Sequence, residues 1–241
     1  MQPQKIFFDN DNKPSSEEIE NHLEHPDCPL NKIIVSEKNE GNMEILKMFA
    51  HTAYSLPNHS CRGMSFVILS TAGQGKTYVV RQWAATIGIP FVFVQSDALA
   101  DNHHLFNLIQ KAFESTTPII EQPADKYTVP PCIVFLDEIH ALPNRVMDGL
   151  LNAMEYNDGK MKITVGKGLR SRSMEVDCRE VCWVGATTEE GKLPGPFASR
   201  LETAIIWHPA GPEEICDIVN LQYPELSDEA CWAVAKYRTV A

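Results

Sequence analysis

The stretch GQGKT, residues 73–77, stands between a short apolar run and a segment with helical periodicity. With the residues before it, it reads S-T-A-G-Q-G-K-T and departs from the pattern G-x-x-x-x-G-K-[ST] only at Ser70. Loops of this pattern surround phosphate groups with backbone N–H groups, and the helix that follows adds the positive end of its dipole. The sequence therefore predicts a phosphate-binding loop at a strand-to-helix turn.

Each side chain of this loop has an expected task. Gly73 and Gly75 allow close approach of the backbone and positive φ values. Lys76 is expected to reach the β- and γ-phosphates of a nucleotide, and Thr77 to offer its hydroxyl to Mg²⁺. Ser70 replaces a glycine with the next smallest polar side chain. The predicted nucleotide-binding residues of the loop are Ala72, Gly73, Gln74, Gly75, Lys76, Thr77 and Tyr78. The alternative is a glycine-rich turn that binds no ligand.

Two acids end another apolar run, IVFLDEIHAL at residues 133–142. Ligands of open α/β sheets bind at the carboxyl ends of the strands, where Asp137 and Glu138 are expected to lie. Asp137 is predicted to hold Mg²⁺ through water, and Glu138 to polarise the attacking water, which are two tasks of ATP hydrolysis beyond phosphate binding. The alternative is a pair of solvated acids at a strand end.

A third stretch, VGATTEEGKLPGPFASRLE at residues 184–202, ends an apolar strand in Thr187 and Thr188. A hydroxyl at a strand end can position water or contact a γ-phosphate. Arg200 follows only after a short helical segment, so it is not assumed to join the same site. The site of a neighbouring subunit is its natural target.

Strand and helix patterns alternate along the chain and must position these residues. Apolar runs predict strands at 65–69, 91–94, 132–137, 181–187 and 203–207, and helical spacing predicts helices at 42–56, 77–87, 102–114 and 144–156. A hairpin is expected at 161–177, a long proline-containing loop at 115–131, and two helices after Pro212. Such alternation predicts an α/β fold with a parallel sheet.

The chain divides into three parts on this reading. Residues 1–30 are acidic and little periodic, and we expect a flexible, loosely held extension. Residues 31–210 carry the predicted phosphate-loop domain, and residues 211–241 the start of a small helical domain.

Composition limits the partners. The formal net charge of −11 excludes binding of nucleic acid through bulk electrostatics, so a DNA contact must be focal. Lys167, Arg170 and Arg172 make the tip of the predicted hairpin basic, which suits either a partner or DNA, or is simply a solvated hairpin end. No apolar run is long enough to span a membrane, and the start is too polar for a signal peptide, so we expect a cytoplasmic protein without a membrane partner.

The seven cysteines are scattered, without a C-x-x-C pair or a histidine at zinc-ligand spacing. We therefore expect reduced thiols that serve as small apolar side chains.

The three motifs, in this order, resemble those of the AAA+ ATPases, and within them are similar to the RuvB family of Holliday-junction branch-migration motors. The resemblance covers roughly residues 33–241. LDEIHALPNRVMDGLLNAME and VGATTEEGKLPGPFASRLE have counterparts in other AAA+ members, whereas the hairpin ITVGKGLRSRSMEVD is similar to RuvB in particular.

The resemblance implies roles for individual residues. Lys76 and Thr77 would belong to Walker A, Asp137 and Glu138 to Walker B, Thr188 would be sensor 1, and Arg200 the arginine finger that reaches the next subunit. Ile33 and Ile34 would contact the adenine. The implied fold is a five-stranded parallel sheet with helices on both faces, followed by a helical lid.

The resemblance also implies a function and partners. We expect an ATP-hydrolysing motor module that assembles into a ring, hexameric when complete, and couples ATP turnover to DNA translocation or branch migration. A RuvA-like partner is expected at the hairpin 161–177. Walker A departs from the family at Ser70, and the chain stops before the expected sensor 2 arginine and winged-helix DNA-binding domain, so DNA contact is expected through regions outside this sequence. The alternatives are a non-motor AAA+ subunit, of the clamp-loader or assembly-switch kind, and a protein-remodelling ATPase.

Overall fold

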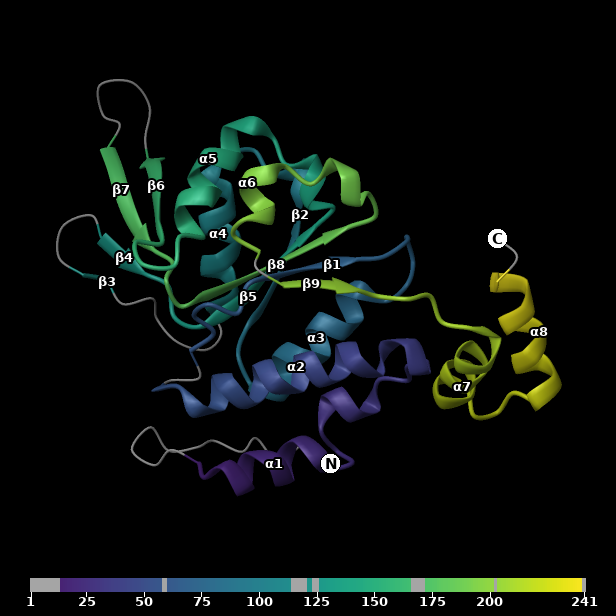
Figure 1. Ribbon diagram of the computed structural model, residues 1–241. Coiled ribbons are helices and arrows are strands. Elements are labelled where there is room, and N and C mark those ends of the chain that lie inside the picture. Colours follow the sequence, from purple (N-terminus) through teal and green to yellow (C-terminus); the bar gives the residue numbers. More distant parts are fainter. Residues whose placement is uncertain are drawn as a thin grey trace.

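The central sheet has five parallel strands in the order β2-β5-β8-β1-β9 (Figure 1). Its strands are β1 Phe66–Leu69, β2 Phe91–Gln95, β5 Cys132–Asp137, β8 Val181–Thr187 and β9 Thr203–Ile206. The computed structural model describes residues 14–57, 60–113, 121–122, 126–165, 172–201 and 203–239. The predicted α/β fold with a parallel sheet is confirmed.

The central strand β5 is buried on both faces, which explains why it reads as a continuous apolar run. Val134 and Leu136 belong to one hydrophobic cluster, whereas Ile133 and Phe135 belong to another. Side chains alternate across a strand, so the sheet separates two cores. Asp137, the last residue of β5, and Glu138, which follows it, therefore lie where the strand leaves the core at its carboxyl end.

Helices cover both faces of the sheet (Figure 1). On one side lie α1 Ser16–Glu24, α2 Glu37–Ser55 and α3 Lys76–Ile87, and on the other side lie α4 Asn102–Phe113, α5 Asn144–Ala153 and α6 Gly195–Ala198. Short 3₁₀ helices η1 Pro29–Lys32, η3 Ser96–Ala98, η4 Ile139–Ala141 and η6 Glu190–Lys192 connect these elements. Gly185 of β8 permits close packing, because a Cβ atom there would lie 3.0 Å from the Ile139 side chain of η4.

The prediction of a loosely held N-terminal extension is wrong for residues 14–30. Helix α1 begins with a capping box, in which Glu18 N donates to Ser15 Oγ at 3.3 Å and Ser15 N donates to Glu18 Oε2 at 2.8 Å. Ile19 and Leu23, one turn apart, are buried with Leu30 in the cluster beneath α2 and α3. The segment reads as acidic overall because only Ile19 and Leu23 interrupt its charged and polar residues. Residues 1–13 lie outside the described residues.

A second sheet has the order β3-β4-β7-β6, with β6 Lys160–Val165 and β7 Arg172–Asp177 as the predicted hairpin. The expected long loop at 115–131 instead contains β3 Glu121–Gln122 and β4 Lys126–Thr128. Strand β4 pairs with β7, which is distant in sequence, and is too short to show alternation. The hairpin tip, with Lys167 and Arg170, lies outside the described residues, whereas Arg172 begins β7.

The two helices α7 Pro212–Gln222 and α8 Asp228–Thr239 stand apart from the sheet and pack on each other (Figure 1). Their small core consists of Ile215, Cys216, Cys231 and Ala235. The segment that leads to them is attached to the start of α2, because His208 N donates to Asn39 Oδ1 at 3.0 Å and Asn39 Nδ2 donates to His208 O at 2.9 Å.

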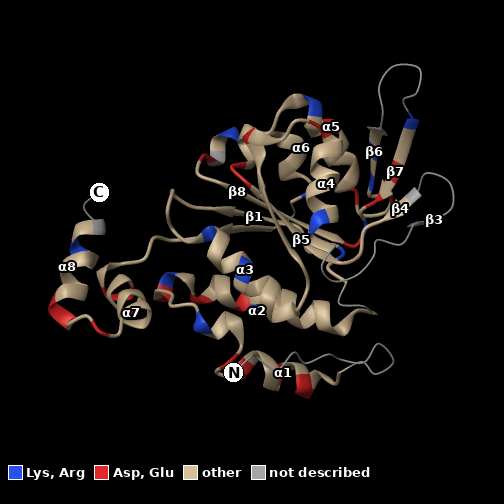
Figure 2. Cartoon of the chain, turned by 180° about the vertical axis from the view of Figure 1, so that it is seen from behind, with Lys and Arg blue, Asp and Glu red and all other residues tan. Residues whose placement is uncertain are grey.

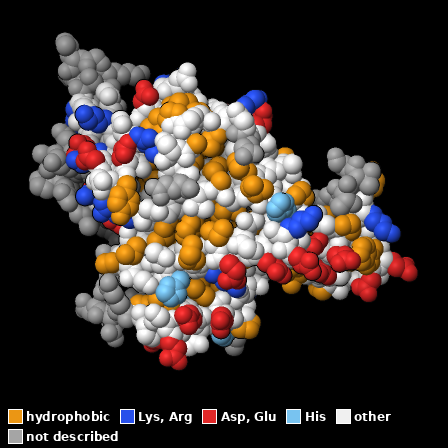
Figure 3. Space-filling view, in the orientation of Figure 1, with side chains coloured by type: hydrophobic (Ala, Val, Ile, Leu, Met, Phe, Trp, Pro, Cys, Tyr) orange, Lys and Arg blue, Asp and Glu red, His pale blue; other side chains and the backbone are white. Residues whose placement is uncertain are grey.

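Acidic residues gather on α7 and α8 and near α1, while basic residues are dispersed along the chain (Figure 2). The space-filling view shows acidic side chains over α7 and α8 (Figure 3). All seven cysteines are free and buried, as expected of small apolar side chains. None of the helices in the described part of the chain is long and apolar enough to cross a membrane.

Candidate functional site

The carboxyl ends of β1, β5 and β8 bring the three motifs to one edge of the sheet. Leu69 lies beside Thr187 in the parallel register of β1 and β8, and Leu136 lies beside Gly185 in that of β5 and β8. Ser70 N donates to Thr187 O at 3.3 Å, which ties the start of the loop to the end of β8. Residues separated by more than a hundred positions in sequence therefore meet at this edge.

The loop between β1 and α3 has the backbone of a phosphate-binding site. Gly73 and Gly75 have φ values of 73° and 78°, where side chains other than glycine are strained. A Cβ atom on either would meet nothing within 4 Å, so the space in front of the loop is open. Gly75 is also the N-cap of α3. The positive end of the helix thus faces an accessible, amide-lined loop, which fits a phosphate.

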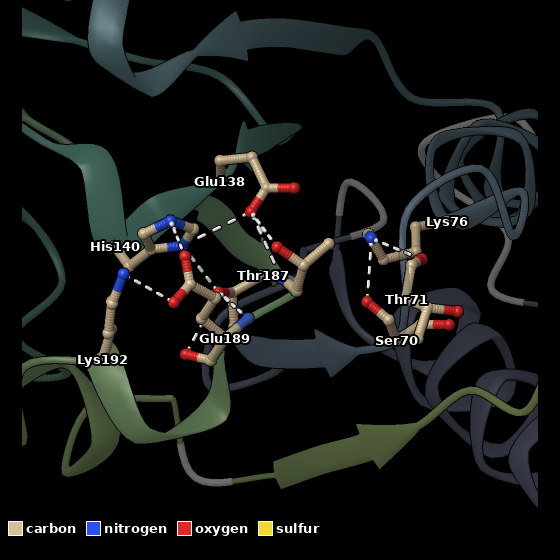
Figure 4. Close-up of polar contacts among 9 residues, drawn as sticks. Ser70, Thr71, Lys76, Glu138, His140, Thr187, Glu189 and Lys192 are labelled. Atoms are coloured by element: carbon tan, nitrogen blue, oxygen red, sulfur yellow. Dashed lines mark hydrogen bonds and ion pairs between the residues drawn. The ribbon is translucent and has the colours of Figure 1, made fainter.

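Lys76 is buried, and its ammonium group lies over this loop. Lys76 Nζ donates to Ser70 O and to Thr71 O, each at 3.1 Å (Figure 4). Ser70 itself points inward: its buried Oγ has no hydrogen-bond partner among the described residues. The serine that departs from the sequence pattern therefore leaves the outer, phosphate-facing side of the loop unobstructed.

The acids at the end of β5 form a site that is short of positive charge. Burial, and next the negative charge of Glu138, raise the pKa of Asp137, while Lys76 opposes the shift and Asp97 adds to it. Asp97 lies in η3, directly after β2, so a further carboxylate faces the same edge. Carboxylate oxygens crowded in this way favour a hard divalent cation.

The donor set fits Mg²⁺ held partly by substrate. No group of three or more metal-binding side chains occurs in the ranges that the structure describes. Mg²⁺ typically takes one or two carboxylates and completes its shell with phosphate oxygens and water. Asp137 and the hydroxyl of Thr77 are the residues that would hold it.

Glu138 is positioned by both its backbone and its carboxylate. It has φ 48° and ψ 56°, and is the single described residue other than glycine with positive φ. Such backbone strain, about 1–3 kcal/mol, persists where the surroundings hold it, here through the bond from Ala141 N to Glu138 O at 2.8 Å. Glu138 Oε2 accepts from Thr188 N at 3.2 Å and from Thr188 Oγ1 at 3.1 Å.

Thr187, the last residue of β8, and Thr188, which follows it, differ in their surroundings. Thr187 is fully buried, and its Oγ1 lies 2.7 Å from His140 Nδ1. Thr188 is partly exposed and contacts Glu138 directly. Of the pair, Thr188 is therefore the hydroxyl that both meets the predicted base and remains accessible to a ligand.

Arg200 lies elsewhere. Its Nε donates to Leu151 O at 3.1 Å, and its guanidinium forms an ion pair with Glu155. It lines a cavity of about 160 Å³ together with Arg62 and Trp183 at the start of β8. The structure does not bring Arg200 together with Lys76 and Glu138, and its role toward a neighbouring subunit stays a prediction.

The predicted adenine contacts, Ile33 and Ile34, follow η1 and are half-buried. Ile33 packs against the cluster under α2 and α3. Their role stays a prediction.

Sequence reasoning missed His140 and Asp97. His140 stands two residues after Glu138 within the quoted motif, so proximity to the acids was the available signal. Asp97 follows a predicted strand, as Asp137 does, but without a motif around it. Only the strand order β2-β5-β8 shows that its charge reaches the same edge.

The sequence model of the family described as "ATPase family associated with various cellular activities (AAA)" matches residues 66–208. The chain belongs to the AAA ATPase family. The matched range contains the loop, both acids, both threonines and Arg200.

Relatives of this AAA ATPase carry the name "Holliday junction branch migration complex subunit RuvB". The protein of Sulfurimonas denitrificans is 32% identical over 108 residues, which are 43% of this chain and 32% of that protein. The protein of Staphylococcus aureus strain JH9 is 39% identical over 88 residues, which are 34% of this chain and 26% of that protein. The matches thus span a third or less of these relatives.

A solved structure named "Thermotoga maritima RuvB Holliday junction branch migration motor" has a similar fold. The TM-score is 0.59 at 18% identity, with 89% of this chain and 60% of that chain covered. The named relatives confirm the resemblance to RuvB that the motifs indicated. The solved structure confirms the AAA+ fold.

Proposed function

We propose that this AAA ATPase is a motor module of the RuvB type, which assembles into a ring and couples ATP turnover to DNA translocation or branch migration. The observation that carries the proposal is the convergence of Lys76, Asp137, Glu138 and Thr188 at one sheet edge, in a chain whose named relatives are RuvB subunits. The proposed ring would be hexameric.

The chain's own residues supply the steps of hydrolysis. The amides of residues 72–78 and the ammonium of Lys76 bind the β- and γ-phosphates, and Ile33 and Ile34 hold the adenine. Thr77 and Asp137 would hold Mg²⁺, which would offset part of the negative charge of the phosphates. Glu138 accepts a proton from the attacking water. Thr188 hydrogen bonds to Glu138 and directly follows Thr187, whose carbonyl accepts from Ser70 N at the start of the loop.

Two parts of the proposal need a partner. Arg200 would exchange its ion pair with Glu155 for the phosphates in the next subunit, where its charge stabilises the transition state. The hairpin 161–177 would contact a RuvA-like protein through its basic tip. Contacts to DNA through this chain alone should be weak and strongly salt-dependent, because the net charge is −11.

A second candidate, a nucleotide-dependent assembly switch without DNA movement, is favoured by the acidic side chains over α7 and α8 (Figure 3). Such a surface repels the DNA backbone and suits a basic protein partner.

The deciding experiment measures unwinding or branch migration of a synthetic four-way junction by this protein, with and without ATP. The motor reading predicts ATP-dependent strand exchange that is lost in Glu138→Gln. ATP turnover without any movement of the junction, combined with nucleotide-dependent binding of a protein partner, would support the switch and exclude the motor.

A further inference from the structure

His140 stands two positions after Glu138, the predicted base, and its side chain faces the Glu138 carboxylate. Its Nδ1 lies 3.3 Å from Glu138 Oε2 and 2.7 Å from Thr187 Oγ1, and its Nε2 lies 3.6 Å from Glu189 Oε1 (Figure 4). The imidazole side chain is mostly buried, with 15% of its surface exposed. His140 thus stands between two carboxylates and is fixed by a buried hydroxyl.

The contacts on Glu138 all meet at one of its two oxygens. Oε2 receives the backbone N–H and the hydroxyl of Thr188 and faces His140 Nδ1, while the other oxygen points away from these groups (Figure 4). A carboxylate held by one oxygen keeps the other available to accept a proton. Catalytic side chains need such support to stay within about half an ångström of the productive position.

The other neighbours hold the imidazole rather than the base. Thr187 Oγ1 accepts from Glu189 N at 3.0 Å, so this hydroxyl is itself fixed at the strand end. On the opposite side of the ring, Lys192 forms an ion pair with Glu189 at 2.6 Å. The charged groups around His140 are therefore Glu138 on one side and the Glu189–Lys192 pair on the other.

From this geometry we infer that His140 is a positioning residue for ATP hydrolysis: through Nδ1 it holds Glu138 in the orientation from which the free carboxylate oxygen activates water. This inference rests on the proposed role of Glu138. It predicts that loss of His140 lowers the rate of the chemical step and leaves nucleotide binding intact, because the imidazole touches no residue of the phosphate loop in the contacts described.

The first test replaces His140 by leucine, which keeps the bulk and removes both nitrogens. We expect kcat for ATP hydrolysis to fall at least tenfold, with KM and the Kd of a fluorescent ATP analogue unchanged within twofold. The matched control is His51→Leu on α2, the same substitution at a partly exposed histidine remote from the site, which should hydrolyse at the wild-type rate. A changed Kd with an unchanged kcat would overturn the inference.

Conservative variants separate positioning from packing. His140→Asn can place an amide near the position of Nδ1, whereas His140→Gln places it near that of Nε2. We expect the asparagine variant to recover kcat to within threefold of wild type and the glutamine variant to remain low. Equal loss in both, or rescue by glutamine alone, would show that the contact between Nδ1 and Glu138 is not what matters. Thermal melts of all variants identify any that fail to fold.

A double mutant tests whether His140 acts through Glu138. In the Glu138→Gln background, His140→Leu should lower the residual turnover no further, because a residue that only positions the base has nothing left to position. A further tenfold loss would place its effect elsewhere.

The same measurements distinguish the two levels of argument. If wild type turns over no ATP, or Glu138→Gln turns over as fast as wild type, the proposed role of Glu138 fails. If Glu138→Gln is inactive while His140→Leu matches wild type, only the positioning role of His140 fails.

Discussion

Glu138 combines the predicted base with a strained backbone and a carboxylate that Thr188 holds by two hydrogen bonds. Glu138→Gln keeps the shape and the hydrogen-bonding capacity but loses the charge that accepts a proton. Turnover should fall by about a hundredfold or more, the usual size of a general-base effect, while ATP still binds. Phosphate release and a nucleotide titration measure the two effects. Lys76→Ala is the complementary control, because it should abolish binding; equal turnover in Glu138→Gln and wild type would remove Glu138 from its role.

The ionised carboxylate of Asp137 destabilises the folded protein, and its proposed role as a Mg²⁺ ligand explains why it is there. Burial and the charge of Glu138 raise its pKa in the folded protein, so the stability linked to its proton is complete at low pH and is lost as the pH rises through the folded-state pKa. Asp137→Asn should therefore raise the melting temperature of the nucleotide-free protein at pH 7, because asparagine carries no charge to bury.

This gain in melting temperature should disappear at acid pH, where Asp137 of the wild type is protonated and therefore as uncharged as the asparagine. The asparagine variant should also lose the stabilisation that Mg²⁺ and ATP together give the wild type. A melting temperature that is lower at pH 7 and equally lower at acid pH would contradict the electrostatic account of this site.

At the scale of elements, the turn from β1 into α3 depends on a backbone that only glycine adopts without strain. Gly75→Ala places a Cβ at φ 78° and should destabilise the protein by about 1–2 kcal/mol, since no atom lies within 4 Å to add a clash. Gly41 within α2 is the matched control, because it is helical and also has open space around it. Gly41→Ala should stabilise by about 0.5–1 kcal/mol in urea denaturation; the same sign for both variants would refute the argument.

Helix α1 is expected to be part of the folding unit despite its acidic surface. Ile19→Ala should cost about 2–5 kcal/mol, the range for removing a buried aliphatic side chain, because Ile19 is 1% exposed in the cluster beneath α2 and α3. Glu20→Ala, one position further on the exposed face, should change stability by less than about 0.5 kcal/mol. Urea titration followed by circular dichroism compares the two, and equal effects would mean that α1 is not anchored.

At the scale of the whole molecule, Arg200 is expected to complete a neighbour's site. Within its own chain Arg200 is paired with Glu155. Because it would act only in the site of a neighbouring subunit, hydrolysis should rise more than linearly with protein concentration as subunits assemble. Arg200→Ala should bind nucleotide but turn over slowly. Mixed with Glu138→Gln, it should partly recover activity, because some intact pockets then lie beside intact arginines.

The control for this mixture is Lys76→Ala with Glu138→Gln, which should show no recovery because neither subunit has a competent pocket. If the mixture containing Arg200→Ala hydrolyses no faster than its components under conditions where subunits exchange, Arg200 does not act in trans.

Local sequence patterns predict most strands and helices of this protein and several residues of its candidate site. The strands of the central sheet are apolar runs because both their faces are buried, and the loop 70–77 and the pair Asp137 and Glu138 are recognisable because phosphate and metal chemistry demands fixed residue types at fixed spacing. The hairpin and the terminal helices follow from periodicity in the same way.

The remaining features depend on contacts between segments distant in sequence. Two apolar residues, Ile19 and Leu23, are too few to predict a buried helix face, which exists because α1 packs against α2. Strand β4 exists because it pairs with β7. The sequence by itself determined which residues can bind phosphate and metal. The tertiary structure decided that Thr188, Asp97 and His140 surround the acids while Arg200 lies apart, because the order and register of parallel strands are fixed by packing across the whole sheet rather than by any local run of residues.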